Sequence, residues 1–95
     1  MDKLKISEIQ IIPVKPREGL VAFASCVVND FLYLGSVGIY TSPSKPGSFR
    51  LVYPSKTLPN GKEVSCVHPI TREVGELISK AIIRRFREIA SKAIE

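Results

Sequence analysis

Histidine and cysteine are scarce in this sequence, which removes the usual residues of metal binding and nucleophilic catalysis. His68 is the one histidine and precedes Pro69 at a strand exit, where a structural hydrogen bond is a simpler role than general base catalysis. Cys26 and Cys66 are far apart and lack a Cys-x-x-Cys spacing, so both are expected to be buried free thiols. No carboxylate pair is marked by its spacing. We therefore expect no enzyme, no bound metal and no cofactor.

Long apolar runs and phosphate-binding loops are missing as well. No stretch of 18 or more apolar residues exists, and the N-terminus has no apolar signal segment. Neither Gly-x-x-x-x-Gly-Lys-[Ser/Thr] nor Gly-x-Gly-x-x-Gly occurs, and the Gly-x-x-Gly at 35–38 falls in a strand-like run rather than between helices. These absences predict a cytoplasmic protein with no membrane association and no small-molecule substrate.

The composition that remains favours a folded, basic chain. Apolar residues make up 44% and charged residues 24% of the 95 positions, which is typical of globular proteins. This length predicts one domain over residues 1–95, and a domain of this size hides only roughly 60 to 65% of its unfolded surface, so we expect a homodimer. Fourteen Lys and Arg against nine Asp and Glu give a net charge of +5, which favours acidic partners such as nucleic acid.

Alternating and β-branched residues predict five strands. Pro13 indicates that the first strand lies at a sheet edge, whereas 20–28 is apolar on both faces and is expected to lie centrally, covered on both sides. Gly35 and Gly38 suggest a bulge or a close backbone approach. The predicted strands are 4–14, 20–28, 31–40, 49–53 and 64–68, joined by a loop at 15–19, a turn at Asn29-Asp30, a loop at 41–48 and a turn at Asn60-Gly61.

After residue 70 the hydrophobic period changes to that of a helix. Thr71 can accept a hydrogen bond from an early backbone amide, and Glu73 and Glu76 meet the positive end of the helix dipole. The predicted apolar stripe consists of Val74, Ile78, Ala81, Ile82, Ile89 and Ala93, with Phe86 on its flank. The sequence therefore predicts an α+β fold, in which antiparallel β-hairpins form a mostly antiparallel sheet and one C-terminal amphipathic helix packs on it.

The same helix carries the clearest functional pattern. Lys80, Arg84 and Arg87 lie four and three residues apart, so they project together from the face opposite the apolar stripe and could follow a phosphate backbone. Arg85 and Lys92 could widen this row. The alternative interpretation is that cations simply favour the last turns of a helix, where the dipole is negative, while glutamates keep the surface mixed.

Four aromatic residues offer a second possible contact with nucleic acid. Tyr33, Tyr40, Phe49 and Tyr53 fall in predicted strands, and aromatics on a sheet can stack on bases. No RNP-type motif accompanies them, and their alternating positions are also those that core packing fills with large side chains. We therefore interpret them as core residues, with stacking as the alternative.

One block of the sequence resembles the central motif of the stage V sporulation protein G (septation regulator) family. It runs from Pro54 to Gly61 and is followed by His68-Pro69-Ile70; the opening strand Lys5–Ile9, the turn Asn29-Asp30-Phe31 and the C-terminal helix extend the resemblance over nearly the whole chain. Thr57 and Asn60 stand where members usually have arginine and aspartate. The resemblance implies a homodimer associated with control of cell division and sporulation, with DNA and RNA binding in several members.

Two functional hypotheses follow. The first is a non-enzymatic, dimeric nucleic-acid-binding regulator. The second is a protein-interaction module of the division machinery whose positive face meets an acidic partner, which Ile83 beside that face favours. The residues expected to contact phosphates are Lys80, Arg84, Arg87, Arg85, Lys56, Lys62 and Arg72.

Overall fold

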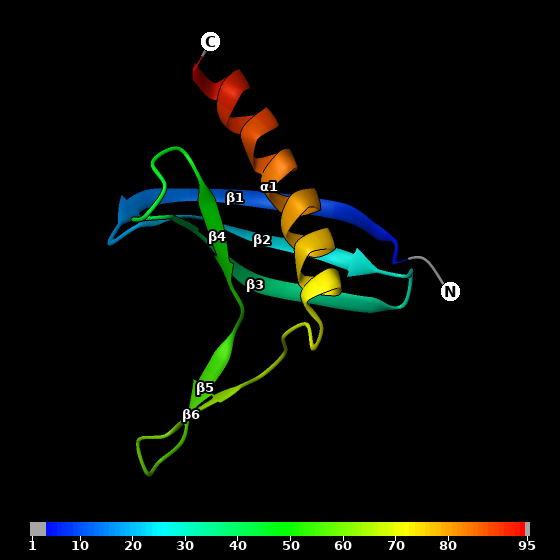
Figure 1. Cartoon of the computed structure of the whole chain (residues 1–95), viewed down its shortest axis with the longest axis vertical. Coiled ribbons are helices and arrows are strands. Elements are labelled where there is room, and N and C mark those ends of the chain that lie inside the picture. Colours follow the sequence, from blue (N-terminus) through cyan, green and yellow to red (C-terminus); the bar gives the residue numbers. More distant parts are fainter. Residues whose placement is uncertain (1–3, 95) are drawn as a thin grey trace.

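The structure, a computed structural model, describes the backbone of residues 4–94 and the side chains of residues 4–90. It consists of strands and one long C-terminal helix (Figure 1), so the predicted α+β class is confirmed. The side chains of Lys92 and Ala93 lie outside the described residues. The elements are β1 (Ile6–Arg17), β2 (Leu20–Val28), β3 (Leu32–Thr41), β4 (Phe49–Val52), β5 (Ser55–Thr57), β6 (Glu63–Ser65) and α1 (Arg72–Ile94).

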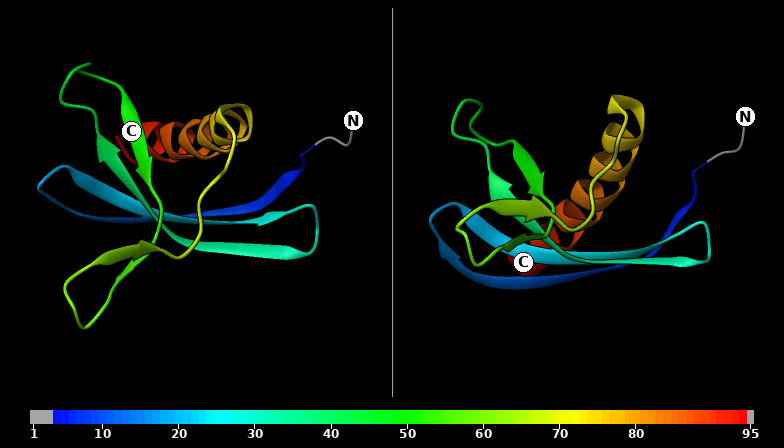
Figure 2. Two further views of the ribbon diagram at one scale, coloured as in Figure 1. Left: turned by 60° about the horizontal axis from the view of Figure 1, so that its bottom comes forward. Right: turned by 90° about the horizontal axis from the view of Figure 1, so that it is seen from below.

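The strands form two antiparallel sheets. The first has the order β1-β2-β3-β4, and α1 crosses one of its faces (Figures 1 and 2). The second consists of β5 and β6, which pair only with each other. The predicted set of strands lacked β5, because its three residues are all exposed and show no apolar alternation. The turn at Asn60-Gly61 brings β5 against β6, so its pairing rather than its composition makes it a strand.

The first hairpin turn is tighter than predicted. Glu18 and Gly19 both have positive φ, 51° and 91°, and they alone connect β1 to β2. The predicted loop at 15–19 was therefore wrong at its start, because an edge strand tolerates Pro16 and β1 continues to Arg17. The turn at Asn29-Asp30 also has positive φ at both residues, as expected.

The core lies between the sheet and α1. Ala22, Ala24 and Cys26 point from β2 toward the helix, and their small side chains leave room for Ile78 and Ile82 to pack closely. Leu34, Val37 and Ile39 complete the buried cluster from β3. The predicted apolar stripe of the helix is confirmed at Val74, Ile78, Ala81, Ile82 and Ile89, which are buried or half-buried, and Phe86 on its flank is half-buried as well.

The opposite face of the sheet has no cover from the described residues. Phe23 in β2 is 40% exposed and Ile12 in β1 is 62% exposed. The expectation that 20–28 would be central was correct, but the expectation that it would be covered on both sides was wrong, because one helix can cover only one face. We call this uncovered side of the β1–β4 sheet the outer face.

The two cysteines have different environments. Cys26 is buried, and its burial raises the pKa of the thiol. Cys66 is exposed, so the prediction that both thiols are buried was wrong for this residue. Cys66 directly follows β6, and its N–H donates a hydrogen bond to the Pro54 carbonyl at 3.0 Å. Its side chain is not part of the buried core.

The first sheet has two edge strands, β1 and β4, and the longer of them is β1. Pro13 and Pro16 each remove an amide donor, and a bulge between Ser7 and Gln10, with Glu8 at φ 48°, interrupts the regular ladder. Such features disfavour pairing of an edge strand with another chain. The edge position predicted from Pro13 is confirmed.

Thr71 caps the helix as the sequence predicts. Its Oγ1 accepts a hydrogen bond from the Val74 N–H at 3.1 Å. Replacing Thr71 with Ala is expected to lower the free energy of unfolding by about 1 kcal/mol, measured by urea denaturation. Thr71→Ser retains the acceptor and is the matched control; equal stability of the Ala and Ser variants would contradict the cap.

No helix in the described part of the chain has the length and apolar content needed to span a bilayer.

Candidate nucleic-acid interface

The charges of α1 are divided along its length. From Arg72 to Ser79 the helix holds one cation and two carboxylates, whereas from Lys80 to Ile94 it holds five cations and one carboxylate. Cations in the second half are stabilised by the negative end of the helix dipole. The second half of α1 is therefore the most basic segment of the chain.

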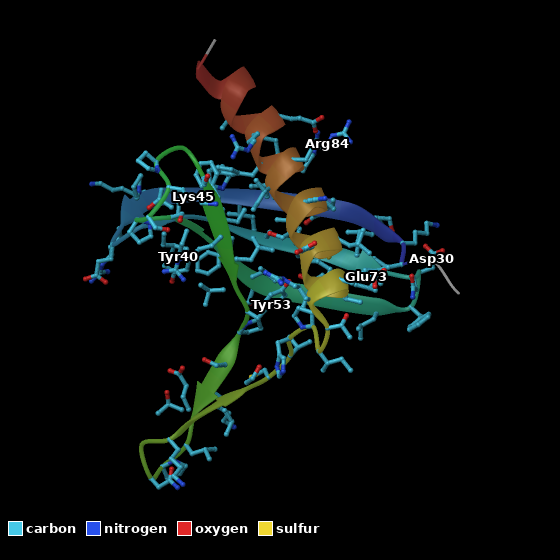
Figure 3. All side chains as sticks on the ribbon, viewed as in Figure 1. Asp30, Tyr40, Lys45, Tyr53, Glu73 and Arg84 are labelled. Atoms are coloured by element: carbon cyan, nitrogen blue, oxygen red, sulfur yellow. The ribbon has the colours of Figure 1, made fainter. Side chains whose placement is uncertain are left out.

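Lys80, Arg84 and Arg87 come together on this half of the helix, as their spacing predicts. They line one shallow hollow, together with Ser79, Ile83 and Glu88. Lys80 and Arg84 are exposed, and among the side chains of residues 4–90 neither forms an ion pair. Their charges are thus available to an anion from solvent. Figure 3 shows Arg84 extending sideways from the helix.

Arg87 has a structural role in addition to its charge. Its Nη2 donates to the Gly47 carbonyl at 3.1 Å, and its guanidinium carbon lies 5.2 Å from the centroid of the Phe49 ring. Phe49 in turn meets Phe86 edge to face, with centroids 5.0 Å apart. Arg87 therefore fastens the loop between β3 and β4 to the helix, and part of its donor capacity is used there.

Arg85 and Arg72 do not line this hollow, and each lies close to a glutamate instead. Arg85 Nη1 lies 3.3 Å from Glu88 Oε1, and both side chains are about half exposed. Arg72 Nε lies 3.6 Å from Glu76 Oε1 at the start of the helix. Exposed pairs of this kind are weak, so each can exchange its carboxylate for another anion at little cost. The structure does not bring either residue into the group formed by Lys80, Arg84 and Arg87.

Lys56 and Lys62 lie on a separate part of the molecule. The β5–β6 hairpin projects away from the sheet and the helix (Figure 1), and we call residues 55–65 the arm. Both lysines are exposed; the Lys62 N–H donates to Asn60 Oδ1 at 3.0 Å, and its carbonyl accepts the Leu58 N–H at 2.7 Å. The arm thus carries two cations and the carboxylate of Glu63, and it lies apart from the second half of α1 (Figure 1).

One cation near the helix was not among the predicted site residues. Lys45 is exposed in the loop between β3 and β4, two residues before the Gly47 carbonyl that accepts from Arg87. Figure 3 labels Lys45 and Arg84 on the loop and the helix that this contact joins. Residues 47 and 87 are 40 positions apart, so no local sequence signal indicates their proximity.

The four aromatic candidates divide between the two faces of the sheet. Phe49 and Tyr53 pack against the core, as predicted. The core interpretation was wrong for Tyr33, which is 71% exposed on β3, and it fails in part for Tyr40, which is half-buried on the outer face. The Tyr53 hydroxyl is buried without a hydrogen-bond partner in the described part of the protein, and burial raises the pKa of this phenol.

His68 makes the local hydrogen bond that its position predicts. Its Nδ1 lies 2.7 Å from Ser65 Oγ, and Ser65 Oγ also donates to the Val67 carbonyl at 3.3 Å. These contacts hold the exit from β6. Within the described ranges, no group of three or more histidines, cysteines or carboxylates could hold a metal ion.

Comparison with known proteins agrees with the family resemblance seen in the motif from Pro54 to Gly61. The family model described as SpoVG matches residues 4–88, which include every strand and most of α1. A Treponema denticola protein named "Putative septation protein SpoVG" is 27% identical over 85 residues, covering 90% of this chain and 88% of that protein. The match extends over the sheet, the arm and the basic helix, and the chain belongs to the SpoVG family.

Proposed function

We propose that this protein is a non-enzymatic, cytoplasmic regulator of septation or sporulation that binds DNA or RNA through the second half of α1. The observation that carries the proposal is the pair of exposed cations, Lys80 and Arg84, that share one hollow and lack ion-pair partners among the described side chains. Cations that neutralise phosphates supply most of the non-specific affinity for nucleic acid, and a rigid helix holds Lys80 and Arg84 in place for this contact. The name of the Treponema denticola relative supports the septation role.

The proposed regulator acts as a homodimer. The chain exposes 7233 Å², whereas a compact monomer of 10.5 kDa exposes about 5,400 Å². The excess of about 1,800 Å² is of the size that association can hide. The arm contributes to it, and an isolated two-stranded hairpin is only marginally stable in water. These features support assembly with a second copy.

A second candidate function has one observation in its favour. Ile83 is half-buried and lines the same hollow as Lys80 and Arg84. An apolar side chain among cations suits an acidic protein partner, whose own apolar residue would cover it. In this alternative, the hollow binds a component of the division machinery, and any affinity for nucleic acid is incidental to the function.

A salt titration of binding tests the first function. Labelled DNA and RNA, single-stranded and duplex, would be titrated with the protein between about 50 and about 200 mM salt. Two to three phosphate contacts per chain predict a slope of log affinity against log salt of about −2 to −3, and about twice that for a dimer using both helices. Absence of binding at the lowest salt would refute the proposed function and favour the protein partner.

A further inference from the structure

The outer face presents aromatic rings to solvent. The strand registers place Phe23 opposite Gly38, Tyr33 opposite Val27, and Tyr40 opposite Arg50 on the side away from α1. Phe23 is 40% and Tyr33 71% exposed, and Tyr40 is half-buried. Exposed aromatics on neighbouring strands of one sheet are the arrangement on which unpaired bases stack.

Two of these rings lie over glycines of their own strand. A Cβ added to Gly35 would come within 2.6 Å of Tyr33 Cε2, and one added to Gly38 would come within 2.8 Å of Tyr40 Cε1. Each ring therefore rests on the backbone in the space that a side chain would take. Tyr33 leans forward by two residues and Tyr40 leans back by two, so both rings are directed toward the middle of β3. Tyr33, which is 71% exposed, leaves the other surface of its ring open, whereas the Arg50 guanidinium lies over the half-buried ring of Tyr40.

The surroundings of the rings are polar and positively charged. Gln10, Ser25 and Ser36 line a shallow hollow together with Ile12, Phe23 and Tyr33. The guanidinium carbon of Arg50 lies 5.3 Å from the centroid of the Tyr40 ring. Strands β2, β3 and β4 carry no charged residue besides Arg50, and β1 adds Lys15 and Arg17 against Glu8.

We propose that the outer face binds the unpaired bases of single-stranded nucleic acid, an inference that rests on the proposed function and specifies its ligand. Phe23 and Tyr33 stack on bases, the amide and hydroxyls of Gln10, Ser25 and Ser36 reach base edges, and Arg50 meets the backbone. Duplex DNA hides the faces of its bases, so it engages the cations of α1 alone. A second copy of the chain is the weaker occupant, because polar side chains alternate with the rings where the centre of an interface would be mainly apolar.

The test is the pair of variants Tyr33→Leu and Tyr33→Phe. Leucine removes the ring and keeps apolar bulk, whereas phenylalanine keeps the ring; the 71% exposure of Tyr33 makes both compatible with folding. Affinity would be measured by fluorescence anisotropy for a labelled thymidine oligonucleotide of about 12 nucleotides and for a duplex of equal length. We expect Tyr33→Leu to weaken single-strand binding by about fivefold or more, with Tyr33→Phe close to wild type and duplex binding unchanged in both.

Three results would overturn the proposal. Unchanged single-strand affinity of Tyr33→Leu would remove the stacking role while leaving the proposed function intact, provided that the wild type binds. Conversion of a dimer to a monomer by Tyr33→Leu in analytical ultracentrifugation would assign the outer face to a second copy. Failure of the wild type to bind either form would refute the proposed function, and the stacking surface with it.

Discussion

Reversing the charge of Lys80 and Arg84 together is expected to reduce affinity for duplex nucleic acid by on the order of a hundredfold at about 50 mM salt. The two side chains are exposed and line one hollow. Each phosphate contact changes log affinity by about −0.9 for a tenfold increase in salt. Relative to about 1 M salt, one contact therefore raises the affinity roughly tenfold at about 50 mM, and two contacts raise it about a hundredfold. The variant Lys80→Glu/Arg84→Glu removes both contacts and adds repulsion. Its salt slope should fall by about two per chain.

A matched control separates the position of the charges from their number. The variant Lys15→Glu/Arg17→Glu makes the same change on β1. Each reversal lowers the net charge by two, so both double variants go from +5 to +1. Filter binding or anisotropy with one labelled duplex would compare them, after circular dichroism has shown equal helix content. If both double variants lose the same affinity, binding depends on overall charge and the site on α1 is refuted.

Truncation of Ile82 is expected to destabilise the fold by about 2 to 5 kcal/mol. Its side chain is completely buried, and it packs against the small residues of β2 and the larger ones of β3. Ile82→Ala would leave a cavity where the helix meets the sheet, and the small side chains of Ala22 and Ala24 cannot fill it. Because domains of this kind have a total stability of about 5 to 15 kcal/mol, the variant would be partly unfolded at moderate temperature.

Urea denaturation followed by circular dichroism would measure this effect. Leu77→Ala is the control, because Leu77 lies on the same helix but is 45% exposed. We expect its loss to be well below that of Ile82→Ala, at about 1 kcal/mol or less. Equal losses at positions 77 and 82 would mean that the helix does not pack on the sheet as described.

The sequence predicts most of the elements because their signals are local. The edge proline in β1, the positive-φ pair Asn29-Asp30 and the cap at Thr71 each depend on residues within a few positions of one another. β5 was missed because its identity as a strand depends on pairing with β6 across a turn. Cys66 was misplaced because hydrophobicity alone does not show that a segment projects from the core.

The candidate site could be predicted only in part, for a similar reason. A helical spacing of four and three residues is enough to group Lys80, Arg84 and Arg87. The contact of Arg87 with Gly47 and the nearby Lys45 depend on tertiary packing, which no spacing reveals. Alternation in a strand separates its two faces but does not tell which one the helix will cover, so the exposure of Tyr33 could not be foreseen.

The prolines and the bulge of β1 also limit how copies of this protein can meet. A chain that added itself to this margin would find missing donors at two positions and an irregular spacing at a third. Growth of the sheet from molecule to molecule needs both edges, β1 and β4, so the irregular β1 discourages it even when many copies crowd along one stretch of polyanion. Pairing of β4 with the β4 of a second copy would join two molecules and end there.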